Sequence, residues 1–340
     1  MSDVTRAFPS NLLKQPVAER IAYFDKSLIR HPVFRRVQAD LLRTIRYPGG
    51  ATLIFLYGPP SAGKTTLRQF IEQMLTNELG PSTTSLAAVA GVEAVAHDTS
   101  FNWRDYLSRS LIVADALLPH DKKLNYSYRG LRRDSTGHLL VDKSVLSTDL
   151  RRAVEECFQA LRLRAWLVDE AQHTKKRVSG RKLIDQMDAI KSIATLTRTL
   201  HVLIGNYELL DMSTISGQLC WRSIDIEMPR YHIDTEKRVA EFQEVLRSLQ
   251  SYMPVPKLPD LVKHYEYFWQ KSVGCIGVLK NWLTRSLAAA LEDNQSALTL
   301  KHLKLHELPA YKLRQLNLEI SEGEKLRDAR QRGVGNNLPG

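Results

Sequence analysis

Eight consecutive residues have the types and spacing of a phosphate-binding loop. The run Gly58-Pro-Pro-Ser-Ala-Gly-Lys-Thr65 follows an apolar stretch and precedes a helical pattern. In such a loop, glycines let backbone N–H groups curve around phosphates, and the start of the following helix favours negative charge. Lys64 is placed to reach the β- and γ-phosphates, and the Thr65 hydroxyl to bind Mg²⁺. We predict that ATP and Mg²⁺ are bound by Gly58, Pro59, Pro60, Ser61, Ala62, Gly63, Lys64, Thr65 and Thr66.

Two adjacent carboxylates follow a second apolar stretch. Asp169 and Glu170 come directly after residues 165–168. An aspartate in this place would hold Mg²⁺, usually through water, and a glutamate would polarise the water that attacks the γ-phosphate. Adjacent acids after a strand are also common in surface turns, so the pair has meaning only together with the phosphate loop. Together the two motifs predict an enzyme that hydrolyses ATP.

Two further residues are candidates for contact with the γ-phosphate. Asn206 follows the apolar run 201–205 and could hydrogen-bond the γ-phosphate or the attacking water. The alternative is an asparagine that only caps a turn. Arg222, the last residue of Gln218-Leu-Cys-Trp-Arg, is a candidate arginine finger that reaches the nucleotide of a neighbouring subunit. The alternative for Arg222 is a surface salt bridge.

The elements that would position these residues alternate between strand and helix. Short apolar runs at 52–57, 165–168 and 201–205 are typical of buried parallel strands, and 86–96 is a further candidate. Helical spacing recurs at 17–27, 31–46, 65–79 and 182–200. This alternation predicts an α/β fold of the P-loop NTPase type, with a parallel sheet flanked by helices and a small C-terminal helical lid.

The chain divides into four predicted regions. We expect an N-terminal arm with helices over residues 1–50 and an α/β core over 51–252, which carries a basic insertion at about 97–150. Three prolines between 253 and 259 mark the next boundary. A helical lid over 253–310 and a tail over 311–340, flexible toward its end, complete the chain. Within the insertion we expect a hairpin arm over 138–145 and a helix capped by Ser147 or Thr148.

The composition points to a polyanionic partner. The formal net charge is +11 and the isoelectric point is about 9.5, which favours nucleic acid. No apolar stretch approaches membrane-spanning length, and the first nine residues lack the core of a signal peptide, so we expect a cytoplasmic protein that joins the nucleoid when bound to DNA. The three cysteines lack metal-ligand spacing and are expected to be reduced and buried.

Basic residues near aromatic ones are the candidates for contact with DNA phosphates. One cluster lies in the insertion, around Tyr126 and Tyr128, and a second follows the two carboxylates. A solvated run of charges is the alternative for each cluster. The candidates in these clusters are Lys122, Lys123, Arg129, Arg132, Arg133, Lys175, Lys176, Arg177, Arg181 and Lys182, and the next candidates, at and near the helix start that follows the insertion, are Lys143, Thr148 and Arg151.

Six segments together resemble the AAA+ regulators of DNA transposition called TnsC or TniB. They are residues 58–66, 101–106, 169–173, 203–206, 218–222 and 274–280, and they span about residues 30–290. The resemblance implies an AAA+ ATPase that polymerises on double-stranded DNA with ATP, as a ring or a helical filament. It also implies partners: a TniQ-type targeting protein, in some systems linked to a CRISPR effector, and a DDE transposase that promotes hydrolysis and disassembly.

The resemblance also assigns roles to residues and leaves alternatives. It implies nucleotide roles for Lys64, Thr65, Asp169, Glu170 and Asn206, and a trans-acting finger at Arg222. Lys280 stands where many AAA+ proteins have an arginine sensor, which puts a sensing role in doubt. Another AAA+ ATPase, such as an initiator, a loader or a signalling NTPase, stays open. The segment Asp-Glu-Ala-Gln-His (169–173) suggests a helicase, but the sequence offers no second phosphate loop.

Overall fold

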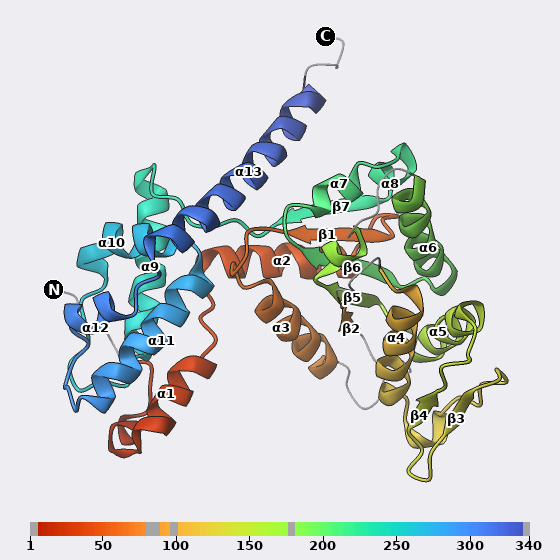
Figure 1. The fold of residues 1–340 in the computed structure, drawn as a ribbon, viewed down its shortest axis with the longest axis horizontal. Coiled ribbons are helices and arrows are strands. Elements are labelled where there is room, and N and C mark those ends of the chain that lie inside the picture. The colour runs from red at the N-terminus through yellow and green to blue at the C-terminus, as the bar shows by residue number, and fades with distance from the viewer. Residues whose placement is uncertain (1–5, 79–88, 96–100, 176–180, 336–340) are drawn as a thin grey trace. The chain divides into compact units, whose positions relative to one another are not determined.

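The computed structural model describes residues 6–78, 89–95, 101–175 and 181–335 (Figure 1). Its contacts divide the chain into two compact units. The sheet unit contains residues 37–57 and 64–227, and the helical unit contains residues 1–36, 58–63 and 228–340. This division falls at 227/228 rather than at the predicted boundary 252/253, because helix α9 (Glu236–Tyr252) groups with the helices that follow it.

Five parallel strands form the centre of the sheet unit, in the order β2-β5-β6-β1-β7. Every residue of β1, β5 and β6 is buried, as expected for strands covered on both faces. The predicted parallel sheet is therefore confirmed. Strand β7 was not predicted, because its sequence Ser-Ile-Asp-Ile-Glu alternates polar and apolar residues at the sheet edge. The strands are β1 (Leu53–Tyr57), β2 (Val89–Glu93), β5 (Ala165–Asp169), β6 (Leu200–Gly205) and β7 (Ser223–Glu227).

Helices cover both faces of this sheet. From β1 the chain crosses to the edge strand β2, and it then returns across the sheet to β5 and β6. Because each crossover is right-handed, the first places helix α3 on one face and the later ones place helices α4–α6 on the other. Helix α3 packs against β2, β5 and β6, while α5 packs against both α4 and α6. The helices of this unit are α3 (Lys64–Asn77), α4 (Trp103–Leu117), α5 (Ser147–Leu161), α6 (Arg181–Thr197), α7 (Leu209–Ser213) and α8 (Gly217–Trp221), and α2 (Pro32–Arg46) enters it at residue 37.

The predicted insertion is smaller than expected. Helix α4 begins inside it, yet Tyr106, Leu107 and Leu111 are buried and the helix packs against β2 and α5. Only the segment after α4 stands apart from the sheet, with the 3-10 turn His120–Lys122 and the antiparallel hairpin β3 (Leu131–Arg133) and β4 (Leu139–Val141). The expected cap of α5 is wrong: the N-cap is Leu146, without a side-chain cap, and Ser147 opens the helix.

A buried carboxylate on α4 holds this hairpin in place. Asp115 is 1% exposed and accepts two hydrogen bonds from Arg133, at 2.7 and 2.8 Å. Tyr126 donates a further hydrogen bond at 3.1 Å, and the Lys123 ammonium lies 3.4 Å from the carboxylate. Burial by itself would raise the pKa of Asp115, but these partners, Arg133 above all, hold it below its ordinary value of 3.8.

The helical unit packs around aromatic side chains that include Phe242, Phe268 and Trp282. Its elements are a 3-10 turn (Ser10–Lys14), α1 (Val17–Lys26), α9, a second 3-10 turn (Val262–His264), α10 (Tyr265–Ser272), α11 (Ile276–Glu292), α12 (Leu300–Leu305) and α13 (Ala310–Gly335). Among the helices of the described ranges, none is both long enough and apolar enough to cross a membrane.

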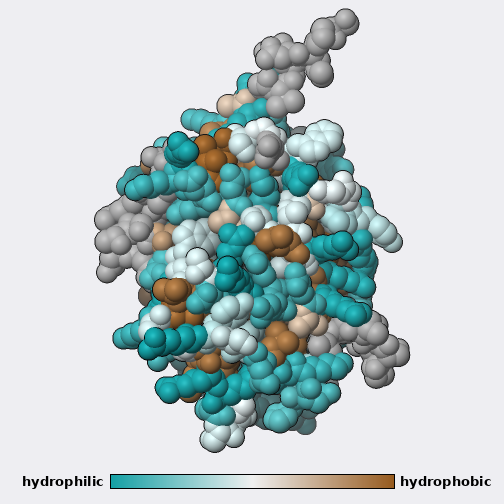
Figure 2. Space-filling view, turned by 90° about the vertical axis from the view of Figure 1, so that its right-hand side faces the viewer, coloured by the Kyte–Doolittle hydropathy of each residue, from teal (hydrophilic) through white to brown (hydrophobic). Residues whose placement is uncertain are grey.

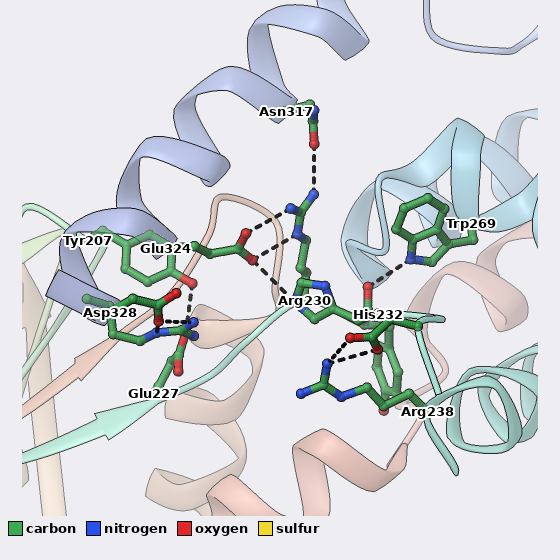
Figure 3. A network of polar contacts seen from close by, with 12 residues as sticks. Tyr207, Glu227, Arg230, His232, Arg238, Trp269, Asn317, Glu324 and Asp328 are labelled. Atoms are coloured by element: carbon green, nitrogen blue, oxygen red, sulfur yellow. Dashed lines mark hydrogen bonds and ion pairs between the residues drawn. The ribbon is translucent and has the colours of Figure 1, made fainter. Parts of the chain in front are cut away.

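Helix α13 occupies the region expected to be a tail, and residues 336–340 lie outside the described residues. Arg230 binds Glu324 through two hydrogen bonds, at 2.8 and 2.9 Å, and Asn317 at 2.8 Å (Figure 3). Burial by itself would raise the pKa of Glu324, but His232 and Arg230 lower it to about 2. Ile320, which is fully buried, packs with Cys275 and Val278. These tertiary contacts fix a segment whose sequence is mostly polar.

The cysteines are free, as predicted, but they are not all buried. Cys157 and Cys275 are buried, whereas Cys220 is exposed. Cys220 belongs to the five-residue helix α8, in which Leu219 is buried whereas Cys220 and Trp221 are exposed.

Asp115→Asn should destabilise the protein by about 3 kcal/mol, because Arg133 would be left without its buried counter-charge. Urea unfolding measures this, with Asp121→Asn, an exposed position on the same segment, as the control. Since the folded-state pKa of Asp115 is depressed, its contribution is present above about pH 4 and is lost as the pH falls through the folded value. The two stability curves should therefore converge in acid. Equal stability at pH 7 would contradict the role given to Asp115.

Candidate nucleotide-binding site

The carboxyl ends of β1, β5 and β6 meet at one edge of the sheet. Tyr57, the last residue of β1, pairs with Gly205, and Val168 of β5 pairs with Leu203 of β6. Helix α3 begins at Lys64 and packs against β5 and β6. Lys64 and Thr65 thus lie in the first turn of a helix, where backbone N–H groups and the helix dipole favour an anion. The Thr65 side chain is exposed and available as a ligand.

Residues 58–63 of the phosphate loop belong to the helical unit. The backbone conformation of this loop requires glycine at two positions. A Cβ on Gly58 would lie 2.1 Å from the carbonyl oxygen of Met228, which no side chain could tolerate. Gly63 has φ +102°, a left-handed conformation that glycine adopts without strain. The Ser61 carbonyl accepts a hydrogen bond from Gly277 N at 2.8 Å, at the start of α11.

Asp169 and Glu170 occupy the tip of β5, as predicted. Asp169 is 3% exposed, and its Oδ1 accepts the backbone N–H of Glu170 at 3.0 Å. Its Oδ2 lies 3.6 Å from an Arg68 nitrogen on α3, beyond the range of a short hydrogen bond. Glu170 has φ +52°, an uncommon conformation for a residue with a side chain, and such conformations cluster at functional sites.

The residues present fit Mg²⁺. The Thr65 hydroxyl and the Asp169 carboxylate are hard oxygen ligands on neighbouring elements. Within the described ranges, no three His, Cys, Asp or Glu residues gather as a metal site, and Mg²⁺ beside phosphates needs only one or two protein ligands. Bound there, Mg²⁺ would neutralise charge on the phosphate oxygens. Glu170 follows Asp169 at the tip of β5, and its role in polarising water stays a prediction.

Gln172 holds the Glu170 carboxylate, and the sequence alone did not assign it this role. Its Nε2 donates to Glu170 Oε2 at 2.5 Å. Its Oε1 is buried without a hydrogen-bond partner in the described structure. A Cβ at position 205 would lie 2.2 Å from this oxygen, so Gly205 leaves the space that Gln172 fills. The available signal was a glutamine two residues after Glu170 together with a glycine at the neighbouring strand tip.

Asn206 lies at the tip of β6, next to β1, but its amide serves a local turn. Its Oδ1 accepts Glu208 N and its Nδ2 donates to Glu208 Oε1, both at 3.0 Å. The turn-capping alternative therefore describes its contacts in this structure, and contact with a phosphate, for which Nδ2 has a second hydrogen, stays a prediction.

Arg222 lies at the opposite edge of the sheet. Its carbonyl oxygen accepts the N–H of Thr52 at 2.9 Å and of Leu53 at 3.2 Å, where β1 begins. Strands rise by about 3.3 Å per residue, so the amino end of β1 is about 13 Å from its carboxyl end. The Arg222 side chain is exposed. The structure therefore separates Arg222 from the strand tips that carry Asp169 and Asn206.

Some of the residues predicted to contact DNA have exposed side chains, and others form ion pairs or hydrogen bonds within the chain. Lys123 and Arg133 bind Asp115 and so have a structural role in the hairpin. Arg151 pairs with Glu155 at 2.8 Å and Lys175 with Asp211 at 2.5 Å, and Lys176 and Arg177 lie outside the described residues. Candidates whose side chains are exposed are Lys122, Arg129, Arg132, Lys143, Thr148, Arg181 and Lys182.

Lys280 has a structural function in the helical unit. Its ammonium donates to the carbonyl oxygens of Asp25 and Ser27, both at 2.7 Å, and so satisfies the carboxyl end of α1. Burial lowers the pKa of this lysine. In the folded chain, Lys280 is therefore committed to α1.

Comparison with known families fits this geometry. Residues 45–212 match a family described as an AAA domain. The protein has an AAA+ P-loop NTPase fold. The matched residues include Lys64, Thr65, Asp169, Glu170 and Asn206, whereas Arg222 follows them.

Two solved structures support the same AAA+ fold. The chain is similar to the Aeropyrum pernix ORC2 protein in its ADPNP–ADP complexes, with 14% identity, a TM-score of 0.50, and coverage of 86% of this chain and 73% of that one. It is also similar to a chain of Drosophila ORC bound to DNA, with 12% identity and a TM-score of 0.51, over 85% of this chain and 64% of that one. No curated protein sequence matches the chain.

Glu170→Gln should bind ATP with unchanged affinity while hydrolysis falls at least about a hundredfold, because the carboxylate that polarises water is absent. Lys64→Ala is the contrasting variant: removal of a charge-assisted hydrogen bond to phosphate should weaken ATP binding by about 2–3 kcal/mol. A fluorescent ATP analogue and phosphate release measure the two steps. Glu292→Gln, at an exposed position on α11, is the control. Full turnover by Glu170→Gln would remove Glu170 from the mechanism.

Proposed function

We propose that this protein is an ATP-dependent switch that assembles on double-stranded DNA and links the selection of a target site to the recruitment of a DDE transposase. The observation that carries the proposal is the separation of Arg222 from the strand tips that hold Asp169 and Glu170. An arginine at the far edge of the sheet cannot complete its own site, but it can complete that of a neighbour. Because hydrolysis would then depend on assembly, the protein would act as a switch.

DNA is the partner that the charge supports. The net charge of +11 favours a polyanion, and the segment that follows α4 presents exposed basic residues on a support fixed by Asp115. A chain of Drosophila ORC bound to DNA shares the fold. The proposed contact is with phosphates and depends little on base sequence.

The role in transposition rests on the six sequence segments that resemble TnsC and TniB. On this basis the proposed partners are a TniQ-type targeting protein, in some systems linked to a CRISPR effector, and a DDE transposase. The proposed location is the bacterial cytoplasm, on DNA.

A second candidate is an initiator-like or loader AAA+ ATPase, which the shared fold with two ORC proteins favours. The two functions differ in the response to a transposase. Under the transposition hypothesis, a partner DDE transposase should accelerate ATP hydrolysis and disassemble the DNA-bound protein. A transposase without effect on either would favour the second candidate.

Neutralising Lys122, Arg129 and Arg132 to Gln should reduce the salt dependence of duplex binding in the presence of an ATP analogue. The slope of log affinity against log salt is negative, and its magnitude should decrease by about 0.9 for each phosphate that the protein no longer neutralises. Fluorescence anisotropy at several salt concentrations measures this. In the control variant, three exposed lysines of the helical unit are replaced by Gln in the same way: Lys257, Lys263 and Lys301. An unchanged slope would remove these three residues from the interface and leave Arg181 and Lys182 to be tested in the same way.

Arg222→Ala should keep the ATP affinity of the free protein and lose hydrolysis. Each of Arg222→Ala and Glu170→Gln lacks a different half of a composite site, so mixtures should recover part of the wild-type turnover at interfaces where the intact halves meet. Turnover is measured against the mixing ratio on duplex DNA. No recovery at any ratio would show that Arg222 does not act on a neighbour's nucleotide.

A further inference from the structure

Helix α12 and the first turns of α13 expose apolar side chains within one short segment of the helical unit. Leu300 is 54% exposed, Leu305 70%, Tyr311 62% and Leu318 58%. Single exposed apolar side chains are ordinary, whereas several together mark a surface that binds a partner. We call the exposed side chains of residues 300–318 the platform.

Helical spacing separates the platform from the buried face of α13. Tyr311 and Leu318 are two helical turns apart and lie on the same face. Leu316 and Ile320 lie on the opposite face, and they pack with Cys275 in the core of the helical unit. Helix α13 is thus attached through one face, and the face that carries Tyr311 and Leu318 is left to solvent.

Helix α12 presents its exposed residues on a fixed support. His302 closes a capping box at the start of the helix. Trp282 of α11 donates to the carbonyl oxygen of Leu303 at 2.9 Å, and Tyr267 of α10 donates to Glu307, just after the helix, at 2.5 Å. A helix of six residues would not persist in water by itself, so these contacts hold it in place. Because the support is already ordered, little conformational entropy is lost when a partner binds.

Basic side chains surround the apolar ones. Glu307 is the one acid in the sequence 300–318, and Lys271 already neutralises it. Lys301 and Arg314 form no ion pair or side-chain hydrogen bond within the residues that the structure describes. Charge complementarity therefore favours an acidic occupant, and the leucines favour an occupant with an apolar face. The exposed cations of the platform are Lys301, Lys304, Lys312 and Arg314.

Other occupants fit this combination less well. Duplex DNA would pair with the cations, but it offers phosphates rather than apolar surface to the leucines. An extended anionic membrane surface would also meet Glu322, which continues the exposed face of α13. A second copy would need an apolar stripe, and the face shown in Figure 2 is largely hydrophilic, with separate hydrophobic patches rather than one continuous area.

We propose that the platform binds an amphipathic helix of a partner protein, with apolar residues on one face and Asp or Glu beside them. Apolar residues of that helix, spaced at i, i+3, i+4 and i+7, cover the leucines and Tyr311, while its acids pair with Lys301 and Arg314. This binding requires neither ATP nor DNA, so it goes beyond the proposed function and does not depend on it.

The probe is a fluorescent synthetic peptide of about three heptads, with Leu at positions a and d and Glu at e and g. Fluorescence anisotropy measures its binding to the full chain without nucleotide or DNA. Leu305→Ser with Tyr311→Ser should weaken binding about tenfold or more, because apolar anchors are lost. In the control variant, Leu140→Ser with Leu146→Ser, two exposed apolar residues of the sheet unit are changed, and the affinity should alter by less than about twofold.

A charge exchange supplies the specific signature. Lys301→Glu with Arg314→Glu should bind the acidic peptide about tenfold more weakly than the wild type does. The same variant should bind a peptide with Lys at e and g more tightly than the wild type does, because the charges are then complementary. Lys257→Glu with Lys263→Glu changes the net charge equally at exposed positions of the helical unit and should do neither. Binding of an ATP analogue verifies that each variant is folded.

An affinity of the wild type for the acidic peptide weaker than about 1 mM would overturn the inference. So would equal binding of the acidic and basic peptides by the wild type, or equal peptide binding by the platform variants and their controls. Binding to duplex DNA, binding to vesicles of equimolar phosphatidylcholine and phosphatidylserine, and self-association are measured with the same variants. A loss confined to one of these, with peptide binding unchanged, would assign the platform to that occupant and overturn the inference. A wild-type chain that binds the peptide but no DNA would sink the proposed function and leave this surface standing.

Discussion

The in-register pairing of parallel strands is the constraint on which the site depends. Because β1, β5 and β6 run in the same direction and end together, the residues that follow them meet at one edge. This places Asp169 and Asn206 beside the helix that starts at Lys64. The same pairing sends the residues that precede the strands, Arg222 among them, to the other edge. One backbone arrangement thus both gathers the predicted nucleotide residues and separates them from Arg222.

Charge has several different uses in this protein. Lys123 and Arg133 neutralise a buried carboxylate and fix the hairpin, and Arg230 performs a similar task for α13 through Glu324. Pairing stabilises these buried groups, because an unpaired buried charge raises the free energy of the folded state. Exposed arginines such as Arg164 gain little within the chain and remain available to a partner. Burial therefore distinguishes structural cations from those that can bind a polyanion or a second copy.

The sequence predicted the elements whose residues are buried on both faces. Strands β1, β5 and β6 are continuous apolar runs, and the phosphate loop fixes the start of α3, so their positions follow from local pattern. Strand β7 and helix α13 lack that pattern, since one alternates at an edge and the other is stabilised by contacts with Arg230 and Cys275 that are distant in sequence. The roles of Gln172 and Lys280 likewise depend on neighbours brought near only by folding.

We propose that each nucleotide site is completed by a neighbouring copy. The most direct measurement is a cryo-EM reconstruction of the protein assembled on duplex DNA with a non-hydrolysable ATP analogue. We expect the Arg222 guanidinium of one protomer to lie within about 3 Å of the γ-phosphate bound by Lys64 of the next protomer. An assembly in which Arg222 lies outside hydrogen-bonding distance of every nucleotide, or contacts the nucleotide of its own chain, would contradict it.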